Sequence, residues 1–330
     1  MSGALSYSKQ LDEALDFIKD NASFLVVSHV QPDGDAISST SVMSWLLQQM
    51  GKRAVLVNES ELPGRLSYLY HYDLIRVYRD EQVEWPAFDA VIALDCADFR
   101  RIGLPSRLFP EGCPLLNIDH HPTNNDYGTV NIVKPDAAAT VEILYDLLLQ
   151  AGYSPDLDCA NAIYTGLLTD TGGFRYSNTS PKVMEIAAKL LAVGVSGSEL
   201  ADHLLEKMTM AGLKLLQLSL SRLMFSDNGE IGWLYIRKDD LKQCGAVSED
   251  MEGIVNYALN VDGVEIGILF KETDDGGVKA SLRSAGKADV AVIAKQFGGG
   301  GHVRASGCRI EQPLEDAMAE LVEAARKALM

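Results

Sequence analysis

Three short, mainly apolar runs each lead, directly or after one residue, into an acidic or histidine residue, and this pattern constrains the fold more than any other feature. The runs are residues 24–27, 90–94 and 115–118, which lead into His29, Asp95 and Asp119. Apolar runs of this length, without alternation, are typical of strands buried on both faces of a parallel sheet. Open parallel sheets bind ligands at the carboxyl ends of their strands. The sequence therefore predicts a functional site at that edge.

Strands and helices alternate through the first half of the chain, which favours βαβ units and a mainly parallel sheet. We expect an α/β fold with a large domain at residues 1–195. The helices expected there are 7–19, 37–50, 138–150, 158–168 and 180–192, and a further strand is expected at 54–57. Residues 198–223 have apolar residues at helical spacing, interrupted only by Gly212. They predict one long helix within a connecting segment at 196–225.

The pattern changes beyond the connecting segment and predicts a smaller α+β domain at residues 226–330. Two hairpins are expected there, one around Asn228-Gly229 and one around residues 274–277. Their strands are 222–225, 231–236, 264–271 and 278–283, and helices are expected at 249–259, 289–296 and 314–328. We expect the sheet of this domain to be antiparallel.

Composition excludes several classes of protein. The formal net charge is −17, so the chain lacks the clustered basic surface that a long duplex nucleic acid requires. The five cysteines show no C-x-x-C spacing, which argues against a disulfide framework or a structural zinc site, and Cys96 is expected to be a small core residue. No apolar run approaches the length of a membrane span and no signal peptide is evident. A reducing cytoplasm is the expected setting.

The acidic and histidine clusters together predict a site for two metal ions. Carboxylates and imidazoles are ligands for Mn²⁺, and a two-metal site needs a bridging carboxylate. The candidates are His29, Asp33, Asp35, Asp95, Asp119, His120, His121 and Asp170, the last of which stands in a glycine-rich turn. Taken singly, Asp33 and Asp35 could be turn residues, Asp170 a helix-terminal acid and His29 a loop histidine. The Asp-His-His run at a buried strand end is harder to explain without a metal, because buried charge must be paired or coordinated.

These clusters resemble motifs I to IV of the DHH phosphoesterase superfamily: His29-x3-Asp33-x-Asp35, Ala93-Leu94-Asp95, Asp119-His120-His121 and the Asp170 turn. The run of four glycines at 298–301 followed by His302 resembles the glycine-rich motif of the DHHA1 subfamily. The resemblance covers essentially the whole chain in the right order. A two-domain chain of this size is most similar to the oligoribonuclease/pAp phosphatase (nanoRNase) group.

The resemblance implies a role for each residue of the first domain. His29, Asp33 and Asp95 would hold one metal, and Asp35, Asp95, His120 and Asp170 the other, with Asp95 as the bridge. Asp119 would orient a metal ligand without binding the metal itself. His121 would contact the scissile phosphate, either stabilising it or assisting the leaving oxygen.

In the second domain the resemblance implies a substrate-binding group. Its members would be Arg283, Gly299, Gly300, Gly301, His302 and Arg304, although Arg304 could instead form a surface salt bridge. Glycines let backbone N–H groups approach phosphate oxygens closely. Phe174 and Phe297 could stack on a base, but core packing is the better interpretation of both.

The resemblance implies a hydrolase that uses two divalent ions, Mn²⁺ before Mg²⁺ or Co²⁺, and a metal-bridged hydroxide. It would degrade short RNA oligonucleotides from an end and convert 3′-phosphoadenosine 5′-phosphate (pAp) to AMP. A gap of fixed width between the metals and the second domain would favour short substrates. Homodimerisation is also implied, and neither long duplexes nor membranes are expected partners. Two alternatives remain at this point: a phosphodiesterase of cyclic or linear dinucleotides, and a nucleotide sensor without turnover.

Overall fold

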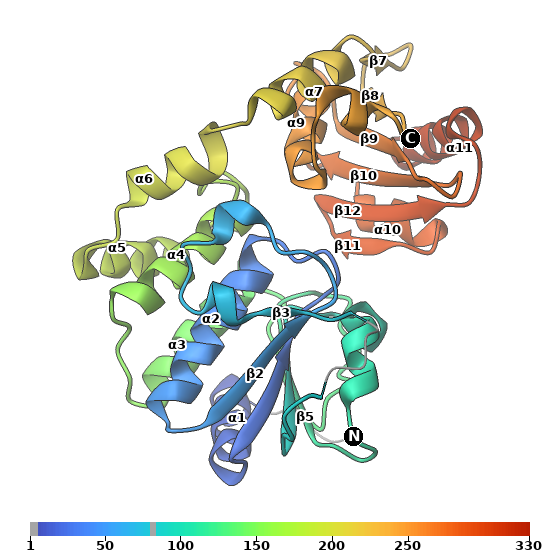
Figure 1. Ribbon diagram of the computed structural model, residues 1–330. Helices are drawn as coiled ribbons and strands as arrows, with labels where there is room; N and C mark the ends of the chain where they lie inside the picture. The colour runs from blue at the N-terminus through green and yellow to red at the C-terminus, as the bar shows by residue number, and fades with distance from the viewer. Residues whose placement is uncertain (1–5, 80–83) are drawn as a thin grey trace. The chain divides into compact units, whose positions relative to one another are not determined.

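The computed structural model describes residues 6–79 and 84–330. The chain divides into two compact units, Met1–Lys207 and Met208–Met330 (Figure 1). Each unit has its own sheet and its own hydrophobic core.

Unit 1 is built on a six-stranded parallel sheet in the order β3-β2-β1-β4-β5-β6. Its strands are β1 (Ser23–Val27), β2 (Arg53–Asn58), β3 (Arg76–Val77), β4 (Ala90–Leu94), β5 (Leu115–Asp119) and β6 (Val130–Val133). The predicted parallel sheet is confirmed, and the edge strands β3 and β6 are additions to it. The strand order reverses between β1 and β4, and the crevice at such a switch point is where open α/β sheets bind ligands.

Both faces of this sheet are buried. Phe24 and Val26 of β1 point into a core shared with the helices α1 (Tyr7–Asp20), α2 (Gly34–Gln49), α3 (Thr140–Gln150), α4 (Leu157–Asp170) and α5 (Pro181–Val193). Leu25 and Val27 point to the other face, which is covered partly by the short 3₁₀ helices η3 (Phe99–Ile102) and η4 (Leu104–Leu108). Burial on both sides explains why the strands are continuous apolar runs.

The predicted single helix at 198–223 is wrong. The segment contains α6 (Gly197–Ala201), a π-helical turn η5 (Asp202–Glu206) and α7 (Met210–Leu220). Thr209 is extended and its hydroxyl accepts the N–H of Gly212, so it starts α7 as a new helix. The two units meet in sequence at this break, between Lys207 and Met208.

Unit 2 contains a six-stranded sheet in the order β11-β12-β10-β9-β8-β7. Its strands are β7 (Met224–Phe225), β8 (Ile231–Ile236), β9 (Ile266–Glu272), β10 (Val278–Ser284), β11 (Gly300–His302) and β12 (Ala305–Ile310). Both predicted hairpins are confirmed as β7–β8 and β9–β10. The β11–β12 hairpin is an addition to them.

The expectation of a purely antiparallel sheet is wrong, because β8 and β9 run parallel. The chain between them contains α8 (Asp240–Cys244), η6 (Ser248–Met251) and α9 (Ile254–Leu259), and a connection of this length allows the crossover that parallel strands require. The helices α10 (Val290–Gln296) and α11 (Leu314–Ala328) contribute residues to the core on one face of the sheet.

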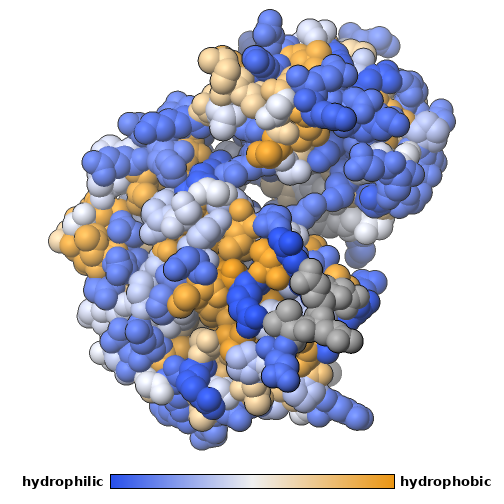
Figure 2. Space-filling view, in the orientation of Figure 1, coloured by the Kyte–Doolittle hydropathy of each residue, from blue (hydrophilic) through white to orange (hydrophobic). Residues whose placement is uncertain are grey.

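The visible surface of both units carries mostly hydrophilic side chains, with smaller apolar areas between them (Figure 2). Among the described residues, no helix combines the length and the apolar character that crossing a membrane would require.

Candidate metal centre

The loop from β1 to α2 carries the first cluster to the carboxyl edge of the sheet. Asp33 caps α2, with its Oδ1 accepting the Ala36 N–H at 3.1 Å, and Asp35 lies fully buried in the first turn. Gly34 is required here, since a Cβ on it would lie 2.4 Å from the Thr169 Oγ1 of α4. The close approach of α2 and α4 therefore brings Asp35 towards Asp170, the last residue of α4 rather than a turn residue.

Asp95 lies between two histidines. It is the first residue after β4 and adopts a left-handed conformation with φ of 53°, which is uncommon for a residue other than glycine. Its Oδ2 lies 3.4 Å from His29 Nε2, and its Oδ1 lies 3.5 Å from His120 Nε2. One carboxylate thus faces both histidines with different oxygens.

The second nitrogen of each histidine fixes which atom faces the carboxylates. His29 Nδ1 lies 2.8 Å from the Val30 carbonyl, and His120 Nδ1 lies 3.2 Å from the Ala137 carbonyl. A carbonyl only accepts hydrogen bonds, so we assign the proton to Nδ1 in both rings. The Nε2 lone pairs then point at the carboxylates, which is the arrangement of histidines that bind metals.

The six predicted ligands form two groups that are able to hold a metal ion. One group is His29, Asp33 and Asp95, and the other is Asp35, His120 and Asp170; within each, the ligand atoms lie within 4.8 Å of one another. Because Asp95 also reaches His120, it connects the two groups. The structure thus brings together all six residues that the sequence suggested as ligands.

The electrostatics of the centre favour bound cations. Burial raises the pKa of Asp35 and of Asp170, and neighbouring carboxylates raise both further. Burial also raises the pKa of Asp95, but the positive charge that the three neighbouring histidines carry when they are protonated outweighs this effect, so the net shift is downward. A set of buried carboxylates that repel one another, interleaved with imidazole lone pairs, fits divalent cations.

Asp119 and His121 form a separate pair beside the two groups. Asp119 Oδ1 lies 2.7 Å from His121 Nδ1, and Asn124 donates to the other oxygen of Asp119 at 2.6 Å. Burial lowers the pKa of His121, but the hydrogen bond to Asp119 and the negative charges of Asp95 and Asp119 together outweigh this effect, so the net shift is upward. Asp95, Asp119 and His121 also lie close enough to hold a metal, but the short Asp119–His121 contact indicates a charge-assisted hydrogen bond.

The N-terminus of α3 contributes positioning groups that the sequence did not indicate. The backbone N–H groups of Thr140 and Val141 donate to Asp35 at 2.6 and 3.1 Å, and the Thr140 hydroxyl donates to Asp95 Oδ1 at 3.0 Å. Asn178 donates to the backbone carbonyl of Asp170 at 3.0 Å. In the sequence, only its position distinguishes Thr140: it follows three alanines, residues 137–139, at the expected start of a helix.

Within unit 2, the predicted substrate-binding residues lie on three neighbouring strands. Arg283 of β10 and His302 of β11 both pair with Ala305 of β12, so the two side chains project from the same face of the sheet. Arg304 is exposed and forms no ion pair among the described residues, so the expected alternative of a salt bridge is absent there. Phe297 and Phe174 pack against the cores of their units.

The glycines of the glycine-rich segment at 298–301 are not all required by the fold. A Cβ on Gly299 would lie 2.1 Å from the Gly307 carbonyl oxygen, and one on Gly301 would lie 2.6 Å from the Ala305 carbonyl oxygen. A Cβ on Gly300 would meet nothing within 4 Å. The fold therefore explains Gly299 and Gly301, whereas at Gly300 it leaves the space open.

Family models match both units. Residues 23–167 match the DHH family N-terminal domain, and residues 241–330 match the DHHA1 domain. The chain belongs to the DHH phosphoesterase family, a class of hydrolases, and carries a DHHA1 domain.

Similar proteins narrow the class further. The bifunctional oligoribonuclease and PAP phosphatase NrnA of Thermus thermophilus is 34% identical over 92% of this chain and 89% of its own length. Among solved structures, an exopolyphosphatase-related protein from Bacteroides fragilis superposes with a TM-score of 0.85 and 26% identity, covering 100% of this chain and 97% of that one. RecJ of Thermus thermophilus, solved in complex with Mn²⁺, shares the fold with a TM-score of 0.54 and 15% identity, over 98% of this chain and 56% of RecJ.

Proposed function

We propose that this protein is a Mn²⁺-dependent phosphoesterase that degrades short RNA oligonucleotides from an end and converts pAp to AMP. The observation that carries the proposal is the Asp95 carboxylate, whose two oxygens face His29 and His120 at 3.4 and 3.5 Å and so join two groups of metal-binding side chains. The similarity to the Thermus thermophilus oligoribonuclease and PAP phosphatase supports the choice of substrates.

The first domain supplies the ligands in this proposal. His29, Asp33 and Asp95 hold one ion, and Asp35, Asp95, His120 and Asp170 hold the other. Two bound divalent ions would lower the pKa of water at the centre and neutralise charge that develops on the phosphate. Mixed carboxylate and imidazole donors suit Mn²⁺.

His121 acts on the substrate and Asp119 positions it. The hydrogen bond to Asp119 keeps a proton on His121 Nδ1 and favours the charged form of the ring. Asn124 fixes Asp119 in turn, and its amide also donates to Asn117 Oδ1 at 2.8 Å. A charged His121 beside the bridging Asp95 would stabilise negative charge on the scissile phosphate.

The second domain binds a further part of the substrate through Arg283, His302 and the glycine-rich segment. Arg283 and His302 flank Ala305 on one sheet face and would bind phosphate oxygens from both sides. The open space at Gly300 would let a ligand approach the backbone there. Gripping a terminal nucleotide in this way would favour short substrates over long ones.

A substrate panel tests the proposal. Purified protein with Mn²⁺ is expected to hydrolyse pAp and oligonucleotides of two to five residues, with much lower kcat/KM on a long single strand. Preference for a cyclic dinucleotide would assign the site to cyclic dinucleotide hydrolysis. Binding of nucleotides without any turnover would identify a sensor and refute the enzymatic proposal.

A further inference from the structure

One face of the unit 2 sheet is only partly covered. The residues that cover it come from α7, α8 and α9 and pack against Leu234 and Ile236 of β8 and Leu269 of β9. No residue of β10, β11 or β12 belongs to that core. On β10, Val278, Ala280 and Leu282 point to the opposite face, into the core formed with α10 and α11, while Lys279, Ser281 and Arg283 point to the partly covered one.

The strand register places the cations of this face in two rows. Lys279 lies directly between Lys271 of β9 and Arg309 of β12. Four residues further along β10, Arg283 lies beside Ala305, which His302 flanks on the other side. Since directly opposed residues of antiparallel strands project from the same face, both rows lie on one surface.

The surface contains no carboxylate on β10, β11 or β12. Its side chains there are Lys279, Arg283, Arg309 and His302, and the remaining outward positions are glycine, alanine or serine. In a chain with a net charge of −17, four basic side chains on strands that carry no carboxylate are unusual, although Asp274, Asp275 and Glu311 lie in the segments that flank these strands. Small residues between the two rows let a flexible chain lie close to the sheet.

The row at Lys279 combines two unpaired lysines with a paired arginine. Arg309 is held by Asp275 and Glu311. The side chains of Lys271 and Lys279 form no ion pair or hydrogen bond with any described residue, although each residue is half-buried. Burial lowers the pKa of Lys271 and the charge of Lys279 lowers it further, and these two effects outweigh the opposite effect of Asp274. Like charges directly opposite each other destabilise a sheet, and an anion bound between them would relieve the repulsion.

We propose that Lys271 and Lys279 form a second phosphate-binding position for oligonucleotide substrates. The four residues from Lys279 to Arg283 span about 14 Å along the strand, so an oligonucleotide held at Arg283 reaches the lysines with a later phosphate. pAp carries its phosphates on one ribose and is too short to reach both rows. The proposal rests on the proposed function and specifies which part of the chain binds the longer substrates.

The composition of the surface also indicates how the strand is recognised. No aromatic side chain projects from the outward positions of β10, β11 or β12, so bases have no stacking platform there. Contact is to phosphates and is independent of base sequence.

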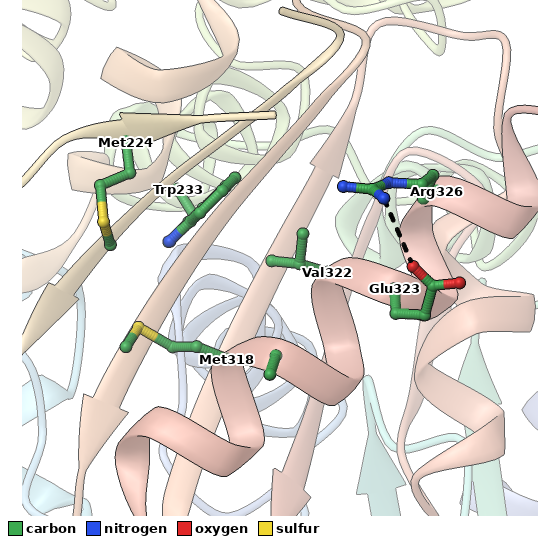
Figure 3. Close-up of a pocket in the computed structure, with 7 residues that line it drawn as sticks. Met224, Trp233, Met318, Val322, Glu323 and Arg326 are labelled. Atoms are coloured by element: carbon green, nitrogen blue, oxygen red, sulfur yellow. Dashed lines mark ion pairs between the residues drawn. The ribbon is translucent and has the colours of Figure 1, made fainter. Parts of the chain in front are cut away.

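A cavity on the opposite side of the same unit has different properties. It has a volume of about 360 Å³, and its lining includes Met224, Trp233, Met318, Val322, Glu323 and Arg326 (Figure 3). Arg326 pairs with Glu323 at 3.8 Å and is not available to a phosphate in the way that the two lysines are. The lysine row is therefore the better phosphate site.

The double variant Lys271→Ala/Lys279→Ala tests the second position. We expect KM for a pentanucleotide to rise about five- to tenfold, with kcat unchanged and kcat/KM for pAp within about twofold of wild type. Lys295→Ala is the matched control, because Lys295 is exposed on α10, which packs on the opposite face. An equal loss on pAp and pentanucleotide, or a loss no larger than in the control, overturns the second position. Thermal melting should be unchanged or raised, because a like-charge pair has been removed.

Direct binding separates this inference from the proposed function. Fluorescence anisotropy with a labelled pentanucleotide, without added divalent metal, requires no turnover. The double variant should bind more weakly, and its slope of log K against log salt should be shallower by about 1.4, the value for two contacts to a single strand. If the wild-type protein hydrolyses no member of the substrate panel but the double variant still binds more weakly, only the enzymatic proposal is refuted. Unchanged affinity and slope refute the lysine row whatever the activity.

Discussion

The hydroxyl of Thr140 lies 3.0 Å from Asp95 Oδ1, while the backbone N–H of the same residue lies 2.6 Å from Asp35 Oδ2. One residue at the start of α3 thus holds a carboxylate from each of two strand-end loops. The helix N-terminus adds a favourable field for both negative charges. Thr140 fixes the orientation of the proposed bridge, although it is no metal ligand itself.

Replacing Thr140 separates this positioning from ligation. Thr140→Val keeps the shape of the side chain and the backbone bond to Asp35 but removes the donor to Asp95. We expect kcat to fall about ten- to a hundredfold, as for the loss of a hydrogen bond to a charged group worth about 1.5–3 kcal/mol. Thr140→Ser should retain activity within about threefold, since it keeps the hydroxyl. Equal activity of the valine and serine variants would remove Thr140 from the positioning role.

The pH profile tests the Asp119–His121 pair. Burial lowers the pKa of His121, but the Asp119 hydrogen bond and the charges of Asp95 and Asp119 together raise it more, so the charged ring persists to higher pH than in an isolated histidine. In Asp119→Asn the contribution of Asp119 is lost while that of Asp95 remains, and the pKa of His121 falls. If the charged ring stabilises the phosphate, the alkaline loss of kcat should begin at lower pH in the variant. An alkaline limb that stays in place, or moves upward, would show that the ring does not act in its charged form.

The glycine-rich segment should give different results at neighbouring positions. Gly299→Ala places a Cβ 2.1 Å from a backbone oxygen and should lower the melting temperature. Gly300→Ala meets no protein atom within 4 Å, so the fold should be kept while KM rises. Thermal melting and steady-state kinetics on both variants check this. A Gly300→Ala enzyme with an unchanged KM would assign that glycine to flexibility rather than to substrate.

Unit 2 contains an ion pair whose contribution depends on pH. Burial raises the pKa of Asp240, but the hydrogen bond from Arg222, at 3.1 Å from Nη2 to Oδ1, outweighs it together with the backbone N–H of Arg237 and the charges of both arginines, so the net shift is downward. The pair therefore stabilises the fold above the ordinary aspartate pKa of about 3.9, and this stabilisation is lost as the pH falls through the lower folded value.

Asp240→Asn should accordingly reduce the free energy of unfolding by about 3 kcal/mol at pH 7, because it leaves the Arg222 charge without its partner. Urea unfolding at pH 7 and near pH 3 measures the difference, which should shrink at the lower pH. Asp239→Asn is the control, because its side chain is exposed and makes no capping hydrogen bond. A destabilisation that is the same at both pH values would contradict the charge-based account.

The strand-end clusters can be predicted because their signal is local. A buried parallel strand is a continuous apolar run, and the residue after it must lie at the carboxyl edge, so Asp95 and the residues at 119–121 can be placed from sequence alone. The glycines at 172–173 place Asp170 in a turn by sequence, but it is the last residue of α4, since the helix continues almost up to those glycines.

Other features depend on contacts between distant residues and leave little trace in the sequence. The bond from Thr140 to Asp95 joins residues 45 positions apart, and threonine is common at helix starts that lie far from any metal centre. The parallel pairing of β8 with β9 depends on the crossover through α8 and α9. The break at 207–209 interrupts an apolar pattern that a continuous helix would also produce, and the capping hydroxyl of Thr209 decides between the two.

The manganese content of wild type and Asp95→Asn tests the central claim most directly. Equilibrium dialysis against Mn²⁺, followed by elemental analysis, counts the ions per chain, and turnover of pAp is measured on the same samples. The account predicts two ions per wild-type chain. In the variant, which keeps the shape of the side chain but loses the shared charge, it predicts loss of at least one ion and a fall in activity of several orders of magnitude. Two ions in Asp95→Asn, with turnover within about tenfold of wild type, would contradict the shared-carboxylate centre.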